Sequence, residues 1–254
     1  MDVRGKAALV TGGATGVGRA TALELARLGC DVAVNYSRSA KEADETVDLV
    51  RAAGARSVAV RADVANDADC RRLVATSVDE LGRLDVLVQS AGVTTFIAHA
   101  DLDRVGDDDW DRLLGVNLKG AFQCARAARG PMLAAGGGAI VNVSSVAGVA
   151  GIGSSIPYCA SKAALNNLTL TLARALAPKI RVNAVAPGFI TGRWLQGGLG
   201  AGYEPIKKAM EQRAPLGRVC EPEDVARAIL GFVTGSDLVT GQVLVVDGGL
   251  LIAG

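Results

Sequence analysis

Leu9-Val10-Thr11-Gly12-Gly13-Ala14-Thr15-Gly16-Val17-Gly18 ends the first apolar run of the chain and places four glycines within seven residues. Gly12 lets the backbone turn, whereas Gly16 and Gly18 let backbone approach a pyrophosphate and let a following helix pack on the strand. The free N–H groups and the dipole at the start of that helix favour an anion. The competing interpretation is a tight strand-to-helix turn with no ligand. The context predicts a phosphate-binding turn formed by Gly12, Thr15, Gly16, Val17 and Gly18.

Short apolar runs recur along the chain and alternate with longer amphipathic stretches. They are rich in Val, Leu and Ile and show little alternation, which is typical of parallel strands covered on both faces. The runs are Ala7–Thr11, Asp31–Tyr36, Ser57–Arg61, Asp85–Gln89, Gly138–Ser144, Ile180–Val185 and Gln242–Val246.

The stretches between these runs carry helix start and stop signals. Asn66 is a predicted N-cap of a helix that ends before Gly82, and Gly29 and Gly54 end the two preceding helices. Strands that alternate with helices indicate βαβ units, which build either an open doubly wound sheet or a closed (β/α)8 barrel. Seven strand candidates and glycines crowded at the first turn favour a Rossmann-type, doubly wound α/β fold with helices on both faces of a seven-stranded parallel sheet.

Length and composition predict one globular domain that spans residues 1–254. The chain has 254 residues, is 50% hydrophobic and carries a formal net charge of +1, so the surface charge gives no reason to expect nucleic acid as a partner. The five cysteines include no CxxC pair, so neither a disulfide framework nor a metal cluster is expected. The start lacks a signal peptide, and polar residues interrupt the apolar segment 139–156, so we expect a soluble, cytoplasmic protein without membrane contact.

The end of the second strand predicts which dinucleotide is bound. An acidic residue there would hold the ribose hydroxyls of NAD and repel the 2′-phosphate of NADP. Instead, the segment ends in Tyr36-Ser37-Arg38, where Ser37 can donate a hydrogen bond and Arg38 can contact a phosphate. We therefore expect NADP, with NAD possible, and we place the adenine near Asp63 and Val64 after the third strand. Arg38 as a solvated charge and Asp63 as a helix cap are the alternatives.

A second group of residues predicts hydride-transfer chemistry. Tyr158 and Lys162 stand four residues apart on one helix face, so the ammonium can stabilise the phenolate and lower the tyrosine pKa. Such a tyrosine can give a proton to a carbonyl oxygen or take one from an alcohol. Ser145 can hold the same oxygen, and the side-chain amide of Asn117 can fix a water toward Lys162. We expect Asn117, Ser145, Tyr158 and Lys162 to be the catalytic residues, with Tyr158 and Lys162 also touching the cofactor.

These motifs together resemble the short-chain dehydrogenase/reductase family, in particular ketoacyl-carrier-protein-reductase-like and sugar-dehydrogenase-like members. The resemblance covers essentially the whole chain. It rests on TGGATGVG at 11–18, Asp63-Val64, NLKG at 117–120, the SSVAG run from Ser144, YCASK at 158–162, Pro187-Gly188 and the closing segment 239–249. The resemblance implies a Rossmann-type sheet of seven strands, a catalytic Asn-Ser-Tyr-Lys set and a homotetramer. It also implies that the nicotinamide half is held by Ser90, Ala91, Gly92, Pro187, Gly188, Ile190 and Thr191.

Two positions depart from the family pattern. Gln89-Ser90-Ala91-Gly92 stands where the family has NNAG, so the bracing of the central sheet by the second asparagine passes to a water or to a shifted neighbour. Gly192 replaces a threonine that usually reaches the nicotinamide amide, and Thr191 lies one residue early. Whether Thr191 substitutes is left open, and the backbone of Ile190 remains able to hold the carboxamide.

A glycine-rich stretch predicts a mobile substrate loop over about residues 192–214. Within it, Trp194 and Tyr203 either line an apolar pocket or pack on a surface helix. His99, the single histidine, has no partner at ligand spacing, so we expect it at the surface or in the pocket lining. No metal site is predicted.

Three functions fit these residues. The first is an NADPH-dependent reductase of a ketone or a 3-oxoacyl thioester, and the second is an NADP(H)-dependent dehydrogenase of a sugar or a cyclic alcohol. The third is a catalytically idle NADP-binding sensor on the same fold, which the complete catalytic set argues against. The small-molecule substrate itself is not predicted.

Overall fold

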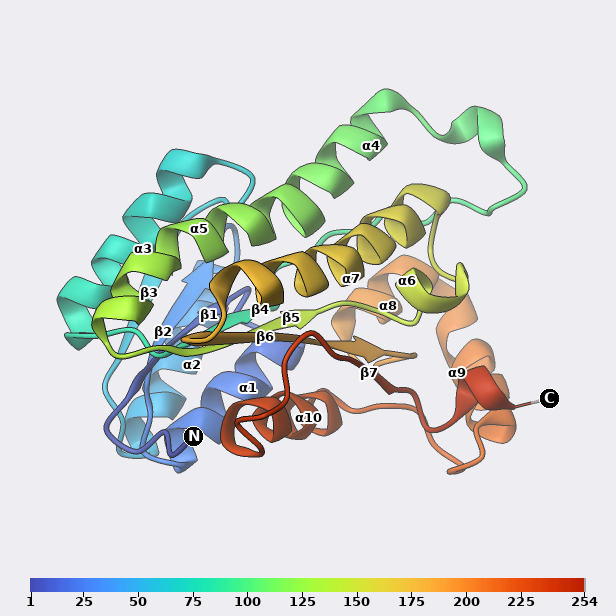
Figure 1. Cartoon of the computed structure of the whole chain (residues 1–254). Coiled ribbons are helices and arrows are strands. Elements are labelled where there is room, and N and C mark those ends of the chain that lie inside the picture. The colour runs from blue at the N-terminus through green and yellow to red at the C-terminus, as the bar shows by residue number, and fades with distance from the viewer. Residues whose placement is uncertain (254) are drawn as a thin grey trace.

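One parallel sheet organises the computed structural model, which describes residues 1–253 (Figure 1). The strands follow the order β3-β2-β1-β4-β5-β6-β7, and the order changes direction between β1 and β4, as in a doubly wound sheet. They are β1 (Ala7–Thr11), β2 (Asp31–Tyr36), β3 (Ser57–Arg61), β4 (Val86–Gln89), β5 (Gly138–Val143), β6 (Ile180–Pro187) and β7 (Val243–Val246). The predicted Rossmann-type sheet of seven strands is confirmed, and the barrel alternative is wrong.

Helices cover both faces of the sheet and bury it in two apolar cores (Figure 1). One face carries α1 (Gly16–Arg27), α2 (Ala40–Ala52) and α10 (Pro222–Thr234). The other carries α3 (Asp67–Leu81), α5 (Ala121–Ala134) and α7 (Ile156–Leu176). Leu9 and Val10 point to opposite faces and are both fully buried, which explains why the strands read as continuous apolar runs.

Shorter helices gather where the chain leaves the sheet. The remaining helical segments are α4 (Asp107–Leu114), a π-helical turn (Gly115–Gly120), α6 (Ala147–Ala150), α8 (Arg193–Leu199), α9 (Tyr203–Arg213) and 3₁₀ turns at Leu102–Arg104, Gly200–Gly202 and Leu250–Ile252. α6 follows β5 and α8 follows β6, so both lie beyond the carboxyl ends of the strands (Figure 1). That edge is where ligands bind in open α/β sheets.

The predicted helix ends agree with the structure. The Asn66 side chain accepts a hydrogen bond from the Asp69 N–H at 3.2 Å and so caps α3. Gly82 ends the same helix with φ +84°, and Gly29 and Gly54 follow α1 and α2 with φ +81° and +92°. The bounds of β1, β2 and β3 agree with the prediction, and those of β4, β5, β6 and β7 differ by one or two residues. Asp85 precedes β4 and accepts a hydrogen bond from the Ala7 N–H at 3.0 Å.

Three further features of the fold concern the cysteines, the lengths of the helices and the end of the chain. All five cysteines are free and buried. Among residues 1–253, no helix combines the length and the apolar character needed to cross a lipid bilayer. Near the end of the chain, Leu251 donates a backbone hydrogen bond to Asp247 at 2.8 Å, while the Ile252 side chain is 85% exposed. Gly254 lies outside the described residues.

A buried chain of side-chain hydrogen bonds joins the middle of the sheet to α7. The Gln89 amide donates to Asn142 Oδ1 at 3.0 Å, and Asn142 Nδ2 donates to Thr169 Oγ1 at 2.9 Å. All three side chains are at most 4% exposed. The expected bracing of the sheet therefore comes from Gln89, the neighbour of Ser90, whose longer side chain reaches across to β5.

Asn142→Ala is expected to lower the free energy of unfolding by about 2–3 kcal/mol, because it leaves the Gln89 amide buried without an acceptor. Thr169→Val leaves the buried Asn142 Nδ2 group without its acceptor and is expected to cost about 1–2 kcal/mol. Urea unfolding followed by circular dichroism measures both. If Asn142→Ala proved as stable as the unchanged protein, the chain of hydrogen bonds would contribute nothing to stability.

Candidate active site

In the turn between β1 and α1, backbone atoms approach two glycines so closely that a side chain has no room there. A Cβ at Gly18 would lie 2.2 Å from the Gly12 carbonyl oxygen, and a Cβ at Gly12 would lie 2.9 Å from Ala91 Cα. Gly16 has φ +52° and, in contrast, no atom within 4 Å of the Cβ position. The turn is therefore tightly packed on the protein side and open at Gly16, as a cradle for an anionic group requires.

Asn35 on β2 holds this turn in place, and the sequence analysis did not identify it. The Gly12 N–H donates to Asn35 Oδ1 at 3.2 Å, and the Gly13 N–H donates to the Asn35 carbonyl at 2.9 Å. The Asn35 amide in turn donates to the Ala62 carbonyl at 3.1 Å, just past β3. The available signal was a lone amide inside an otherwise apolar strand, where only a specific hydrogen-bonding task compensates for its burial.

The polar groups predicted for the dinucleotide surround this turn. Thr15 precedes α1 and makes no side-chain capping bond, so its hydroxyl and the first N–H groups of the helix are available to an anion. Ser37 and Arg38 are exposed at the end of β2. Asp63 accepts from the Ala65 N–H at 3.0 Å, and Val64 is buried beside it. A bound dinucleotide fits this chemistry, with its phosphates toward the open face of Gly16.

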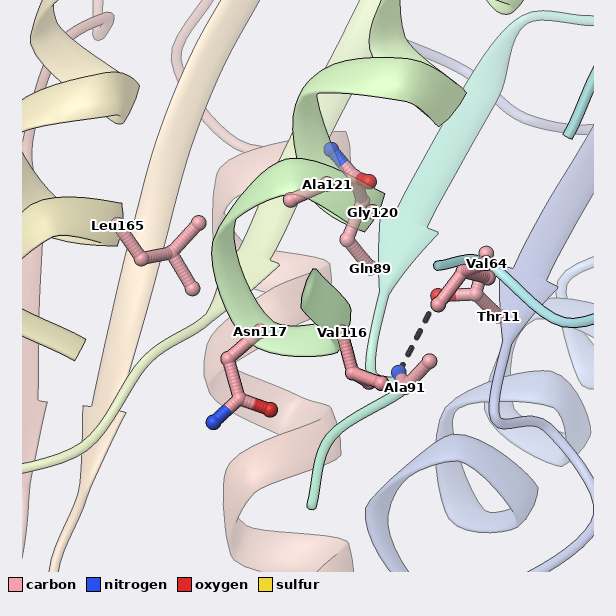
Figure 2. Close-up of a pocket in the computed structure, with 9 residues that line it drawn as sticks. All are labelled: Thr11, Val64, Gln89, Ala91, Val116, Asn117, Gly120, Ala121 and Leu165. Atoms are coloured by element: carbon pink, nitrogen blue, oxygen red, sulfur yellow. Dashed lines mark hydrogen bonds between the residues drawn. The ribbon is translucent and has the colours of Figure 1, made fainter. Parts of the chain in front are cut away.

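The ends of β1 and β4 are fastened together beside the turn. The Ala91 N–H donates to Thr11 Oγ1 at 3.2 Å, which Figure 2 marks with a dashed line, and the Ser90 N–H donates to the Thr11 carbonyl at 3.2 Å. A cavity of about 10 Å³, roughly the size of one water, remains between this joint and the π-helical turn (Figure 2). The segment predicted to contact the dinucleotide, Ser90, Ala91 and Gly92, is half-buried there. It therefore lies next to the phosphate turn.

Tyr158 and Lys162 lie in the first turns of α7, as the spacing predicts. Ser155 caps the helix by accepting a hydrogen bond from the Tyr158 N–H at 3.3 Å. The Lys162 side chain is 4% exposed, donates to the Val143 carbonyl at 2.8 Å and lies 5.7 Å from the centre of the Tyr158 ring. The buried ammonium therefore lies beside the half-buried Tyr158 ring near the carboxyl end of β5.

Ser145 reaches this pair because α6 packs directly on the backbone of α7. A Cβ at Gly148 would lie 2.4 Å from the Lys162 carbonyl carbon, so only glycine allows the contact. Ser144 strengthens it by donating to the Lys162 carbonyl at 3.3 Å. The Ser145 hydroxyl accepts from the Ala147 N–H at 3.1 Å and stands next to the Tyr158 phenol.

Burial controls the proton affinities of the pair. Desolvation raises the pKa of Tyr158 to about 12, against a smaller lowering effect of the hydrogen bond from Ser145. Desolvation also lowers the pKa of Lys162 to about 8. Burial dominates the tyrosine pKa while the ammonium donates to the Val143 carbonyl, and the expected effect of Lys162 on the phenolate stays a prediction.

Asn117 lies on the π-helical turn and is 1% exposed. Its Oδ1 accepts from the Val93 N–H at 2.9 Å, and its Nδ2 donates to the Val93 carbonyl and to Ser161 Oγ, both at 3.0 Å. Both ends of the amide therefore bind protein groups, and the expected contact with a water stays a prediction. The side chain instead ties the segment after β4 to α7, one residue from Lys162.

The segment after β6 differs from the prediction in detail. The Thr191 hydroxyl donates to the Glu221 carboxylate, and its N–H donates to the Cys220 carbonyl at 2.9 Å, so the hydroxyl has a protein partner in place of a carboxamide. Gly188 follows Pro187 and packs on Asp247, whose Cβ would lie 2.8 Å from a Cβ at Gly188. Ile190 is half-buried and pairs with Cys220, which leaves its backbone close to the end of β6.

The predicted loop at 192–214 forms α8 and α9, and its aromatic residues separate. Tyr203 is 5% exposed and packs on Phe189 with ring centres 5.6 Å apart, so it belongs to the core. The Trp194 ring instead reaches Gly92, where a Cβ would lie 3.7 Å from Trp194 Cη2 and equally far from Lys162 Nζ.

His99 is exposed, with its Nε2 3.9 Å from Cys159 Sγ. Within residues 1–253, no three His, Cys, Asp or Glu side chains gather as metal ligands do.

Known proteins share this arrangement along nearly the whole chain. The family model described as enoyl-(acyl carrier protein) reductase matches residues 12–251. The chain is 46% identical over 242 residues to a protein named as a ketoacyl reductase of the granaticin polyketide synthase of Streptomyces violaceoruber, covering 95% of this chain and 94% of that protein. It is 38% identical over 247 residues to a 3-oxoacyl-[acyl-carrier-protein] reductase of Staphylococcus aureus, covering 96% and 98% of the two chains.

A solved structure agrees with these sequence matches. A crystal structure assigned to a short-chain dehydrogenase/reductase of Burkholderia xenovorans superposes with a TM-score of 0.91 at 38% identity, covering 97% of this chain and 98% of that one. The fold and the sequence along nearly the whole chain are thus similar to those of proteins of one kind. The chain belongs to the short-chain dehydrogenase/reductase family of oxidoreductases, which interconvert carbonyl and alcohol groups with a nicotinamide cofactor.

Proposed function

We propose that the protein is an NADP(H)-dependent reductase of a ketone or a 3-oxoacyl thioester. The observation that carries the proposal is the convergence of Ser145, Tyr158 and Lys162 at the carboxyl end of β5. A hydroxyl, a protonated phenol and an ammonium at one place suit an oxygen that gains negative charge during the reaction. The names of the relatives, which include a ketoacyl reductase and a 3-oxoacyl reductase, support the same substrate class.

The residues that would hold NADP follow the carboxyl edge of the sheet. Gly12, Thr15, Gly16, Val17 and Gly18 would hold the pyrophosphate, and Ser37 and Arg38 the 2′-phosphate. Asp63 and Val64 would border the adenine, and Ser90, Ala91, Gly92, Pro187, Gly188, Ile190, Thr191 and Lys162 the nicotinamide half. When bound, the reduced cofactor supplies the hydride. The absence of a carboxylate from Tyr36-Ser37-Arg38 supports NADP over NAD.

The protein's own groups would manage the proton. Ser145 and Tyr158 both donate hydrogen bonds to the substrate carbonyl oxygen, and Tyr158 transfers its proton as that oxygen becomes an alcohol. Burial raises the pKa of Tyr158 to about 12, so the phenol carries its proton at neutral pH, as reduction requires. The Lys162 ammonium stabilises the phenolate that remains, and its pKa of about 8 allows it to pass on a proton afterwards. Asn117 would act as a positioning residue through Val93 and Ser161.

Absorbance of NADPH tests the activity directly. We expect consumption with 3-oxoacyl thioesters or small ketones, and much slower consumption with NADH, because Arg38 can pair only with the 2′-phosphate of NADPH. Arg38→Ala should weaken NADPH binding about tenfold or more and leave NADH binding nearly unchanged. Activity on an enoyl thioester alone would replace the proposed substrate class, and activity only in the oxidative direction would favour the alcohol dehydrogenase.

Tyr158→Phe is expected to lower kcat by about 10²- to 10⁴-fold, because it removes the acid while keeping the ring. The affinity for NADPH, measured by fluorescence titration, should stay within a factor of two or three. Ser145→Ala serves as the matched change of a neighbouring hydroxyl and should lose less, since it removes one hydrogen bond and not the proton. Turnover near the original rate in Tyr158→Phe would refute the acid role.

Exposed apolar side chains on α5, α7 and β7 support a homotetramer. Phe122, Leu133 and Leu170 are each about 40% exposed on the outer faces of α5 and α7, and Leu244 is 46% exposed on the edge strand β7. A tetramer with dihedral symmetry would bury such side chains at its two-fold interfaces. Light scattering should give four chain masses, and Leu244→Asp should reduce the mass to two. A monomeric unchanged protein would contradict the assignment.

A cytoplasmic location suits the same function. The five free cysteines need a reducing compartment if they are to remain thiols. NADPH is available in the same compartment. We therefore propose that the reductase works in the cytoplasm.

A further inference from the structure

The helix α8 is joined to the rest of the chain by two glycines in backbone conformations that other residues rarely adopt. Gly192 precedes it with φ +126°, and Gly200 follows it with φ +53°. The first adjoins the end of β6 and the second leads into α9. Such joints let a short helix move as one piece without strain in its own turns.

α8 covers the catalytic half of the carboxyl edge. The Trp194 ring lies against Gly92 on the same side as Lys162 Nζ. At the other end of the helix, a Cβ at Gly198 would lie 2.0 Å from Phe96 Cε2, so the helix lies flat on this ring and leaves no room for a side chain. These two contacts place α8 over the segment that follows β4.

A third contact extends from α8 to the far side of the dinucleotide-binding edge. Arg193 donates one hydrogen bond to Ser39 Oγ at 3.1 Å and another to the Glu42 carboxylate, both at the start of α2. The hydrogen bond from Arg193 also holds the pKa of the Glu42 carboxyl below its ordinary value. In the sheet, β5, β4 and β1 separate β6, which precedes Arg193, from β2, which precedes Ser39. The arginine thus bridges the edge above the phosphate turn.

The receiving side of this contact is held firmly. Arg19 on α1 donates to the Glu42 carbonyl at 2.7 Å and to Thr46 Oγ1 at 2.8 Å. Thr46 is fully buried and also donates to the Ala14 carbonyl at 3.1 Å, within the phosphate turn. The start of α2 is therefore tied to the turn itself, and Arg193 closes onto a fixed partner.

We propose that Arg193 is a positioning residue that fastens α8 across the bound dinucleotide by pairing with Ser39 and Glu42, and so slows the release of the cofactor. The inference rests on the proposed function, which places the dinucleotide between the phosphate turn, Arg38 and Lys162. A cofactor held by those residues would be enclosed by the bridge and would leave only after the bridge opens. Because both partners are partly exposed, the pair is worth a small factor in rate, about two- to fivefold.

The test is a stopped-flow measurement of cofactor dissociation. Protein loaded with NADPH is mixed with excess NADP⁺, and the loss of energy transfer from tryptophan to NADPH gives the dissociation rate constant. Arg193→Ala and Glu42→Ala should each raise this constant about two- to fivefold. Arg213→Ala, which removes an exposed arginine on the neighbouring helix α9, should leave it unchanged. Equal thermal unfolding midpoints show that the fold is intact.

A variant in which the charges of Arg193 and Glu42 are exchanged distinguishes a bridge between these residues from a direct contact between Arg193 and the cofactor. The double variant Arg193→Glu with Glu42→Arg should restore a slow dissociation rate, because the pair re-forms in reverse. If both single variants release NADPH at the original rate, the bridge has no such role. If the single variants are fast but the exchange fails to restore the rate, Arg193 contacts the cofactor itself and the proposal is overturned. An unchanged protein that shows no energy transfer to NADPH would refute the proposed cofactor, and the bridge with it.

Discussion

The close approach of the phosphate turn to the end of β4 is the constraint on which the site depends. Gly18 rests on the Gly12 carbonyl, and Gly12 rests on the backbone of Ala91, with no space for a Cβ at either place. This contact brings the start of α1 next to the segment that carries Gly92 and Val93. Without it, the N–H groups that can hold a pyrophosphate would stand apart from the lysine and tyrosine that carry out the chemistry.

A second glycine contact has the same role on the catalytic side. Gly148 lets α6 lie on the backbone of α7 at Lys162, and this sets Ser145 beside Tyr158. Asn117 completes the arrangement by linking Val93 to Ser161. The reacting groups thus come from the connection between β5 and α6 and from α7, but backbone-to-backbone packing fixes their relative positions. Rigid elements hold such groups more accurately than loops can.

Burial gives these groups their chemical character. A phenol and an amine ordinarily have similar pKa values. Here the same loss of water raises the pKa of Tyr158 and lowers that of Lys162, so the two values differ. The phenol therefore keeps its proton, and the pKa of the amine lies closer to neutral pH, which makes proton exchange easier. A site of this kind favours proton donation to an oxygen.

Local patterns in the sequence determined the elements and the candidate residues. Apolar runs predicted all seven strands, Asn66 and Gly82 predicted the ends of α3, and the spacing of Tyr158 and Lys162 predicted a shared helix face. These features depend on neighbours a few residues away, so periodicity and capping chemistry are enough. The tertiary structure alone decided which distant groups meet: Gln89 with Asn142, Asn117 with Ser161, and Arg193 with Glu42, 151 residues apart. It also decided that burial raises the pKa of Tyr158, because desolvation depends on everything packed around a group and not on its position along the chain.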